Sequence, residues 1–409
     1  MRKFPLLFLK REFTVKIYIV EKTDKEIKVL FVSGWYPNRQ YPSLGAFVRK
    51  HAEAANLYCD VTVLYVYPDE NIHAFEIVEQ KHNDLREIIV YYPFNTKYIF
   101  YKIFKTINYV RAYRKGYEYI IRKGFSPDVV QVNVLTRTGV MAYLHKLWKG
   151  VPYAIIEHWS RYLPARAEYS GFIRKKLTEK VVKHAAAVLP VSVNLQKAML
   201  NHKLHNPNYM VIHNVVDDSF LEKKEVYPRT KKRILHVSRL DDHSKNINGL
   251  LRVISELSDM RNDFEVVIIG RGFDKVPAYA LTLGLSQEVV SFLGRRATPG
   301  EMAEWFNNCD FFVLFSNYET ASVVILESLV SGKPVVTTNV GGVPEYVNDT
   351  NGIVIPIKDE AELLKSLNYM LDNFQHYDSE KIRQEARKKY TYAKVGKELA
   401  DIYSQILKR

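Results

Sequence analysis

Runs of apolar residues recur along the chain, and helical stretches separate them. In the first half the runs begin at residues 27, 60, 87, 128, 152 and 186, and in the second half at residues 233, 265, 289, 311, 334 and 352. Most runs are continuous, such as VVIIG and FFVLF, which is typical of strands buried on both faces of a sheet. Strands separated by helices indicate βαβ units and parallel sheets. The pattern predicts an α/β protein with two doubly wound, Rossmann-like domains.

The two sets of strands define the predicted domains. We predict a first domain over residues 27–210 and a second over residues 211–391, with the polar stretch Leu221–Arg233 as a linker. Residues 1–26 are predicted to be a disordered or surface-lying extension, because their apolar run is shorter than the roughly 7–15 residues of a signal peptide. Ligands of doubly wound sheets bind beyond the carboxyl ends of the strands. The loops that follow the strands are therefore the places to look for a site.

Composition is ordinary, but charge is unevenly distributed. The chain is 47% apolar and 25% charged, and its two cysteines indicate neither a disulfide scaffold nor a thiolate metal site. No stretch approaches the roughly 20 apolar residues of a membrane span. Of the net charge of +14, residues 1–210 carry 33 Lys and Arg against 17 Asp and Glu, or +16, and the remaining 26 and 28 give −2. A basic first half indicates an anionic partner. Alternatively, the positive charge serves only to keep the protein soluble.

Two cations follow the first strand of the second domain, in the stretch RLDDHSKNINGLL. Arg239 and Lys245 flank an acidic, serine-containing turn that opens a helix. Cations beside a helix N-terminus suit a diphosphate, because the helix dipole, the backbone N–H groups and the fixed charges act together. The alternative is a pair of surface cations around an Asp or Ser cap.

A pair of glutamates follows the apolar run FFVLF. We predict a helix from about Ser322 to Val330, which places Glu319 before the helix and Glu327 within it. Eight helical residues rise about 12 Å, so the carboxylates suit the two ends of an extended ligand with hydroxyl groups, such as a nucleotide sugar. Two solvated surface glutamates would explain the same spacing.

The order of these motifs resembles the retaining glycosyltransferases of family 4, which have the GT-B fold. That family has a Glu-x7-Glu element between a strand ending in Ser and a G-x-P-V-V strand, and then a G-G-x-x-E loop; FSNYETASVVILESLVSGKPVVTTNVGGVPEYV has this order. The stretches HNVVD, VSRLDDHSKNINGLL, VIIGRG and SFLGRR are similar to the family's linker, phosphate clamp and following segments. The resemblance also implies that the last helix, residues 392–409, crosses back to the first domain.

The resemblance implies roles for residues at matching positions. Arg239 and Lys245 are expected to neutralise the leaving diphosphate, while Glu319 orients the sugar and Glu327 holds the ribose. The other residues expected to bind the donor are Gly45, Gly270, Thr320, Ala321, Ser322 and Val323. No metal or other cofactor is expected.

The chain departs from the family at several positions. The family commonly has Gly-Phe-Gly after its first Glu, where this chain has Thr320–Ser322, so the identity of the donor sugar stays open. The usual double glycine near the first strand is reduced to Gly45. This glycine begins a helix whose N-terminus either faces the donor or acceptor or is a plain helix start.

The first domain is expected to bind the acceptor. In AIIEHWSRYLPAR, His158 stands where the family often has a His that reaches the donor sugar, although a strand-end His is often structural. Arg161 and Arg166 are expected to meet an anionic acceptor. Ser192 is either a helix cap or a ligand contact.

Residues 91–124 interleave aromatic residues with Lys and Arg. This pattern suits a helix at an anionic membrane surface, and equally an aromatic-packed helix with a solvated basic face. Nucleic acid is not expected as a partner, because no known binding module accompanies the charge.

We therefore predict a metal-independent, retaining glycosyltransferase of the GT-B fold. It would use a nucleotide-diphosphate sugar and a saccharide or lipid-linked acceptor, in bacterial envelope or exopolysaccharide synthesis. The predicted location is the cytoplasm, with peripheral attachment to the inner face of the membrane. The alternatives are a nucleotide-sugar epimerase of similar fold and a non-catalytic module that binds a polyanion.

Overall fold

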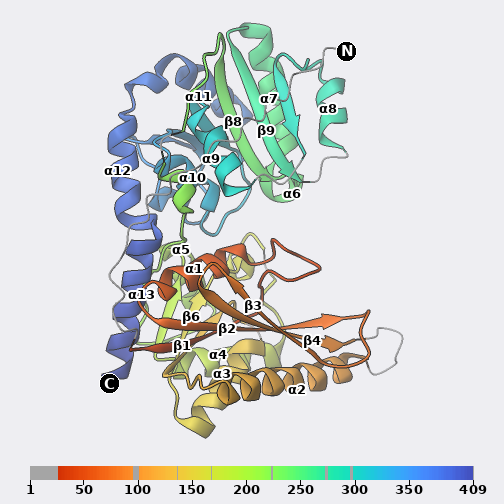
Figure 1. Cartoon of the computed structure of the whole chain (residues 1–409). Helices are drawn as coiled ribbons and strands as arrows, with labels where there is room; N and C mark the ends of the chain where they lie inside the picture. Colours follow the sequence, from red (N-terminus) through yellow and green to blue (C-terminus); the bar gives the residue numbers. More distant parts are fainter. Residues whose placement is uncertain are drawn as a thin grey trace, which may run out of the picture.

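Two sheets with helices packed around them form the two domains of the protein (Figure 1). The computed structural model describes residues 26–94, 101–135, 137–166, 168–222, 224–271, 275–294 and 298–408. The predicted N-terminal extension therefore lies outside the described residues, except for Glu26. Both sheets have the strand order of a doubly wound fold, so the predicted fold class is confirmed.

The first sheet has seven strands in the order β3-β4-β2-β1-β5-β6-β7. Its strands are β1 (Lys28–Ser33), β2 (Asp60–Asp69), β3 (Glu76–His82), β4 (Leu85–Pro93), β5 (Val129–Asn133), β6 (Tyr153–Glu157) and β7 (Ala187–Pro190). All neighbours are parallel except β3 and β4. Six strands coincide with predicted apolar runs. The sequence does not predict β3, because EIVEQKH is mostly polar and lies exposed at the sheet edge.

The helices of the first domain are α1 (Ala46–Asn56), α2 (Tyr101–Arg122), α3 (Arg137–Lys149), α4 (Phe172–His184) and α5 (Val193–Asn201). Helix α1 lies between the sheet and the second domain, whereas α2, α3 and α4 lie on the far side of the sheet (Figure 1). Aromatic contacts join these three helices in a layer. Tyr117 of α2 packs on His145 of α3, and Tyr143 of α3 packs on His184 of α4, with ring centroids 4.5 and 5.2 Å apart.

The second sheet has six strands, all parallel, in the order β10-β9-β8-β11-β12-β13. They are β8 (Lys232–Arg239), β9 (Phe264–Arg271), β10 (Val290–Leu293), β11 (Phe311–Leu314), β12 (Val335–Thr338) and β13 (Gly352–Ile355), each at a predicted run. The chain winds outward from β8 in one direction and from β11 in the other. The loops after these two neighbouring strands therefore flank the crevice where a doubly wound sheet binds its ligand.

The helices of the second domain are α6 (Asp242–Lys245), α7 (Ile247–Met260), α8 (Val276–Thr282), α9 (Pro299–Asn307), α10 (Val323–Val330), α11 (Glu360–Asn373) and α12 (Ser379–Tyr390). The predicted helix at 322–330 is confirmed as α10. None of the described helices combines the length and apolar character that a membrane span requires.

The last helix, α13 (Tyr392–Leu407), returns to the first domain and packs along α1 (Figure 1). The approach is close, because a Cβ atom on Gly396 would lie 2.0 Å from the carbonyl oxygen of Ala54. Tyr403 donates to Gln131 Oε1 at 3.0 Å, which fixes α13 to β5. The predicted return of the C-terminal helix is confirmed.

The predicted linker, Leu221–Arg233, is wrong as a connection between domains. This stretch packs on the second domain, where Arg229 pairs with both carboxylate oxygens of Asp310 at 3.1 Å. The chain passes between the domains earlier, since Val215 belongs to the core of the first domain and Val216 to the second. A polar composition does not identify a linker when the charged residues find partners on a domain surface.

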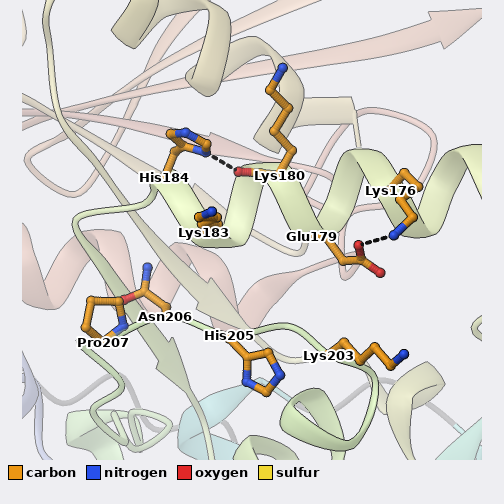
Figure 2. Close-up of a pocket in the computed structure, with 9 residues that line it drawn as sticks. All are labelled: Lys176, Glu179, Lys180, Lys183, His184, Lys203, His205, Asn206 and Pro207. Carbon is orange, nitrogen blue, oxygen red and sulfur yellow. Dashed lines mark hydrogen bonds and ion pairs between the residues drawn. The ribbon is translucent and has the colours of Figure 1, made fainter.

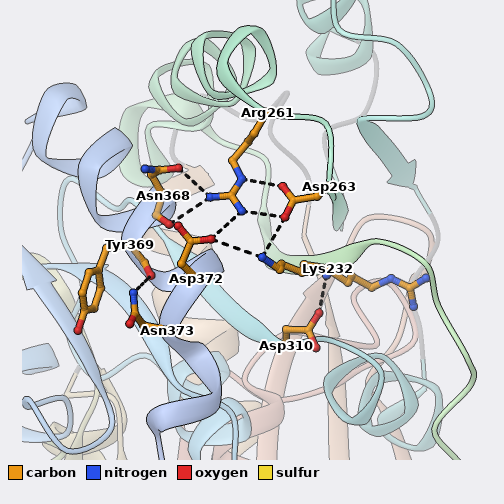
Figure 3. Close-up of polar contacts among 9 residues, drawn as sticks. Lys232, Arg261, Asp263, Asp310, Asn368, Tyr369, Asp372 and Asn373 are labelled. Carbon is orange, nitrogen blue, oxygen red and sulfur yellow. Dashed lines mark hydrogen bonds and ion pairs between the residues drawn. The ribbon is translucent and has the colours of Figure 1, made fainter.

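A cluster of charged side chains joins β8 and the turn before β9 to α11 (Figure 3). Arg261 donates to both oxygens of Asp263 at 2.7 and 2.8 Å and to Asp372 at 2.8 Å. Lys232 lies 2.9 Å from Asp263 and 3.5 Å from Asp372. The hydrogen bonds from Arg261 hold the pKa of Asp263 well below its ordinary value. The cluster stabilises the side of the second domain that holds the start of β8.

Candidate active site

The loops after β8 and β11 are hydrogen-bonded to each other. The backbone N–H of Asn317 donates to the carbonyl of Ser244 at 2.8 Å, and its side chain donates to the carbonyl of His243 at 3.0 Å. Asp241 caps α6 by accepting from His243 N–H and from Ser244 Oγ, at 3.2 and 2.7 Å. These bonds fix the short helix α6, and therefore its last residue, Lys245, beside the loop from β11.

Lys245 and Glu319 form an ion pair in the middle of these loops. Glu319 also accepts a hydrogen bond from Ser316 Oγ at 2.8 Å. The side chains of Lys245 and Glu319 are 17% and 10% exposed, so the pair is largely shielded from water. A ligand that offers a phosphate to the ammonium and hydroxyls to the carboxylate would replace each partner of the pair.

Arg239 stands at the carboxyl end of β8 with an exposed side chain. Its guanidinium makes no hydrogen bond or ion pair with any described residue. Helix α10 begins close to this cation in the cavity wall, and its N-cap residue, Ser322, makes no side-chain capping bond. The cations Arg239 and Lys245 and the N–H groups of α10 together create a positive region suited to a diphosphate.

A cavity of about 460 Å³ opens between the domains at this point, within the usual range for ligand sites. The first domain contributes Phe47, Ser160 and Arg166 to its wall. The predicted site residues that line it are Arg239, Lys245, Glu319, Thr320, Ala321, Ser322 and Val323. Among the described residues, no group of three His, Cys, Asp or Glu is arranged to hold a metal ion.

His158 lies behind the cavity wall and is buried. Its ring packs against Phe47, which lines the cavity, and against His51, with ring centroids 4.5 and 5.2 Å apart. Burial, and then the neighbouring His51, hold the pKa of His158 well below its ordinary value, so the ring is neutral. Its Nε2 has no hydrogen-bond partner among the described residues. This nitrogen is available to a polar group, but the ring does not line the cavity.

Glu327 lies farther along α10 and also outside the cavity lining. Its carboxylate faces α1 of the first domain, where Lys50 Nζ is 3.8 Å from Oε1. Burial raises the pKa of Glu327 to about 7, although Lys50 lowers it in part. Burial therefore favours the protonated form of Glu327 more than in an ordinary glutamate.

The two predicted donor-binding glycines pack closely against neighbouring backbone. Gly45 begins α1 with φ of 63°, and a Cβ atom there would lie 2.4 Å from the carbonyl oxygen of Trp35. A Cβ atom on Gly270 would lie 2.3 Å from the carbonyl oxygen of Ser238 on the neighbouring strand. Neither glycine lines the cavity. Their packing alone explains why glycine is needed at both positions.

The Gly-Gly loop after β12 packs against the backbone of Glu319 and Thr320. A Cβ atom on Gly341 would lie 1.8 Å from the carbonyl oxygen of Glu319, and Gly342 N–H donates to the carbonyl of Thr320 at 3.1 Å. Glu345 then accepts from the first two N–H groups of α5 in the first domain, both at 2.8 Å. The loop thus positions Glu319 and holds the two domains together.

Ser192 is the N-cap of α5 and accepts from Leu195 N–H at 3.1 Å. Its hydroxyl also donates to the carbonyl of Thr320 at 3.2 Å. Of the two readings of Ser192, the structure therefore supports the helix cap, with an added contact between domains.

Sequence reasoning did not identify Tyr318 as part of the site. Arg166 of the first domain donates to Tyr318 Oη at 2.6 Å, and that oxygen lies 3.4 Å from His243 Nδ1. The only signal in the sequence was the place of Tyr318 directly before Glu319. The expectation that Arg161 meets an anionic acceptor is wrong, because Arg161 is buried with its guanidinium 4.0 Å from the centre of the Trp159 ring.

Two Rossmann-like domains with a polar cavity between them define the class of GT-B proteins. HepE of Anabaena, solved in complex with UDP and glucose, matches with a TM-score of 0.68 at 16% sequence identity. The match covers 93% of this chain and 100% of that one. At this identity the likeness establishes the fold alone.

Sequence comparison then gives a family match for the second domain. Residues 217–389 match the family model described as Glycosyl transferases group 1. An uncharacterized glycosyltransferase of Methanocaldococcus jannaschii is 29% identical over 178 residues, or 42% of this chain and 45% of the relative. The N-acetylgalactosamine-N,N'-diacetylbacillosaminyl-diphospho-undecaprenol 4-alpha-N-acetylgalactosaminyltransferase of Campylobacter jejuni is 28% identical over 211 residues, or 50% of this chain and 56% of the relative. The chain thus spans about half the length of these two relatives.

Proposed function

We propose that this protein transfers a sugar from a nucleotide-diphosphate sugar to a saccharide or lipid-linked acceptor, with retention at the anomeric carbon. The observation that carries the proposal is the Lys245–Glu319 pair beside Arg239 in a 460 Å³ cavity between the domains. The cavity therefore contains cations that can bind a diphosphate and, next to them, a carboxylate that can bind sugar hydroxyls. HepE was solved with UDP and glucose, and the Campylobacter relative is named for a diphospho-undecaprenol-linked acceptor.

In this mechanism Arg239 and Lys245 bind the diphosphate and stabilise the negative charge that grows on it as the bond to the sugar breaks. The N-terminus of α10 adds to this field. Glu319 accepts hydrogen bonds from sugar hydroxyls and so orients the anomeric carbon. The cations supply the charge that a divalent metal would otherwise provide, so we propose that no metal is needed.

The remaining predicted residues act from the cavity's edges. Glu327 accepts hydrogen bonds from the ribose hydroxyls once the donor displaces Lys50 from its carboxylate. The neutral ring of His158, which lies behind Phe47, makes one hydrogen bond to the sugar from the first domain only after the domains close on the donor. Contacts from both domains exclude water from the donor, which favours transfer over hydrolysis.

We further propose that the protein works at the cytoplasmic face of the bacterial membrane, in envelope or exopolysaccharide synthesis. The first half of the chain carries the positive charge. On α2, exposed apolar side chains gather near the start of the helix and exposed cations follow: Ile103, Phe104, Ile107, Val110, Arg111, Arg114 and Lys115. Such a helix suits an anionic interface.

The test separates the two glutamates by titrating nucleoside diphosphates calorimetrically into Glu319→Gln and Glu327→Gln variants. We expect Glu327→Gln to weaken nucleoside diphosphate binding and raise KM, because a ribose contact is similar in the ground and transition states. Glu319→Gln should spare this binding and lower kcat. If neither variant changes binding or turnover, the carboxylates do not serve a donor.

A product assay with nucleotide sugars then tests the class of reaction. A transferase releases nucleoside diphosphate slowly without an acceptor. An epimer as the product would instead identify an epimerase, and absence of both products would identify a binding module.

A further inference from the structure

The first domain holds a second, larger cavity of about 780 Å³ (Figure 2). One side is the exposed face of α4, and the other is the segment 203–207 that follows α5. The lining residues are Lys176, Glu179, Lys180, Lys183, His184, Lys203, His205, Asn206 and Pro207. Four lysines and one glutamate are among the lining residues, so the cavity carries excess positive charge. Neither the sugar-transfer site nor the proposed mechanism uses any of these residues.

Two of the four lysines are available for a ligand. Lys176 pairs with Glu179 at 2.9 Å, and Lys180 Nζ lies 5.5 Å from the centre of the Tyr143 ring. Lys183 and Lys203 form no ion pair or hydrogen bond through their side chains with any described residue. An anion with several acceptor oxygens would therefore gain partners here without breaking existing pairs.

The cavity has a fixed frame. Asn206 donates its side-chain amide to the carbonyls of Val182 and Ala185, at 2.7 and 2.9 Å, which ties the segment 203–207 to the end of α4. The carbonyl of His184 accepts from Lys146 of α3 at 2.8 Å. The lysines therefore project from two backbone segments held together by hydrogen bonds.

The cavity lies at the amino ends of the strands of the first sheet, whereas the sugar-transfer site lies at their carboxyl ends. His184 ends α4 just before β7 begins, whereas Ser160, which lines the transfer site, follows the end of β6. The four- and five-residue strands β7 and β6 span roughly 13–17 Å. The two sites are therefore distinct.

Exposed apolar side chains flank the cationic cavity. Phe172 and Ile173 begin α4 and are 77% and 74% exposed, and Leu177 continues their stripe toward Lys180 and the cavity. Near the end of α3, whose Lys146 bonds to the carbonyl of His184, Trp148 is 77% exposed. Large apolar side chains next to lysines, on a helix layer that faces away from the second domain, match the arrangement by which proteins bind an anionic bilayer.

We propose that this cavity binds the phosphate headgroups of anionic phospholipids at a membrane surface. Lys183 and Lys203 contact headgroup phosphates, while Phe172, Ile173 and Trp148 enter the interface between headgroups and acyl chains. The proposal rests on the proposed function in placing the acceptor at a membrane, and it names the residues that hold the protein there.

The experiment measures binding of the whole chain to phosphatidylcholine vesicles with or without phosphatidylglycerol. The pocket variant is Lys183→Gln/Lys203→Gln, and the matched control is Lys365→Gln/Lys388→Gln, which removes the same charge from exposed faces of α11 and α12. We expect the pocket variant to bind anionic vesicles roughly 30-fold more weakly and the control to bind like the wild type. Phe172→Ser/Ile173→Ser should also weaken binding.

Equal loss in the pocket and control variants would overturn the proposal, because net charge alone would then explain binding. A second result would also overturn it. If inorganic phosphate raises the melting temperature only when Lys183 and Lys203 are present, and vesicle binding does not need these lysines, the ligand is a free anion. Turnover of a nucleotide sugar without vesicles should be unchanged in the pocket variant. If vesicle binding behaves as expected and the wild type still shows no sugar transfer, the proposed function fails and the lipid site stands.

Discussion

The buried carboxyl group of Glu327 makes the stability of the protein depend on pH in a defined direction. Its pKa is raised from an ordinary value of 4.5 to about 7, chiefly by burial. Below pH 4.5 the group is protonated in both the folded and unfolded states and has no effect. Between pH 4.5 and 7 the unfolded state loses this proton before the folded state, so stability falls as pH rises. Above pH 7 the full penalty is present.

The size of the penalty follows from the shift. One pKa unit corresponds to about 1.4 kcal/mol, so a shift of 2.5 units costs the folded state about 3 kcal/mol at pH 8. Glu327→Gln removes the titration and keeps the shape. We therefore expect the variant to gain stability relative to the wild type by up to about 3 kcal/mol between pH 5 and pH 8.

The assay is urea-induced unfolding of both proteins at pH 5, 6, 7 and 8, and the quantity compared is the difference between their unfolding free energies. The attraction to Lys50 acts only on the ionised carboxylate and is already part of the pKa of Glu327, whereas a change in packing adds a constant to this difference, so its slope with pH reports Glu327. Lys50→Gln is a second check, because removing the opposing cation should steepen the pH dependence of a protein that keeps Glu327. A difference that stays constant with pH would refute the reasoning.

Three further predictions concern the clamp, the charged cluster and the returning helix. Arg239→Ala and Lys245→Ala should each lower turnover by roughly 10²–10³-fold in steady-state assays, as expected for removal of one transition-state stabiliser, and unchanged turnover in both folded variants would remove them from the mechanism. Arg261→Ala should lower the unfolding free energy by about 1 kcal/mol at pH 7, and the effect should shrink below about pH 4 as the acids bound to Arg261 protonate; a pH-independent loss would contradict this. Gly396→Ala should lower the melting temperature, since its Cβ would meet a carbonyl oxygen at 2.0 Å, whereas Gly300→Ala, with open space around it, is the control.

The fold was largely predictable because parallel strands buried on both faces leave a strong local signal. Twelve strands appear as continuous apolar runs, and the edge strand β3, with its exposed polar side chains, does not. The linker was misplaced for a related reason. A polar stretch suggests exposed chain, but the side chain of Arg229 is only 16% exposed, because its pairing with Asp310 holds it on a domain surface.

The site was predictable where its residues follow strands in the chain. Arg239 and Lys245 come after one strand and Glu319 after its neighbour, so spacing and topology bring them together. Contacts between domains leave no such pattern. The approach of Lys50 to Glu327 and the bond from Arg166 to Tyr318 depend on how the domains close, which no local spacing encodes.

In the proposed function, the positive charge of the first half and the cations of the transfer site serve different partners. Arg239 and Lys245 belong to residues 211–409, whose net charge is −2 when 26 basic residues are set against 28 acidic ones. The excess of +16 in residues 1–210 includes the lysines of α2 and α4, which lie on the side of the first sheet away from the second domain (Figure 1).

At physiological ionic strength charge is screened over about 8 Å, so these outer lysines add little to the field at the donor diphosphate. We therefore expect donor binding to depend on local geometry, and the proposed attachment to an anionic surface to depend on the summed charge of an outer face. Rising salt should release the protein from anionic vesicles before it impairs turnover of a soluble donor, and parallel loss of the two in one salt titration would show that a single set of cations serves both.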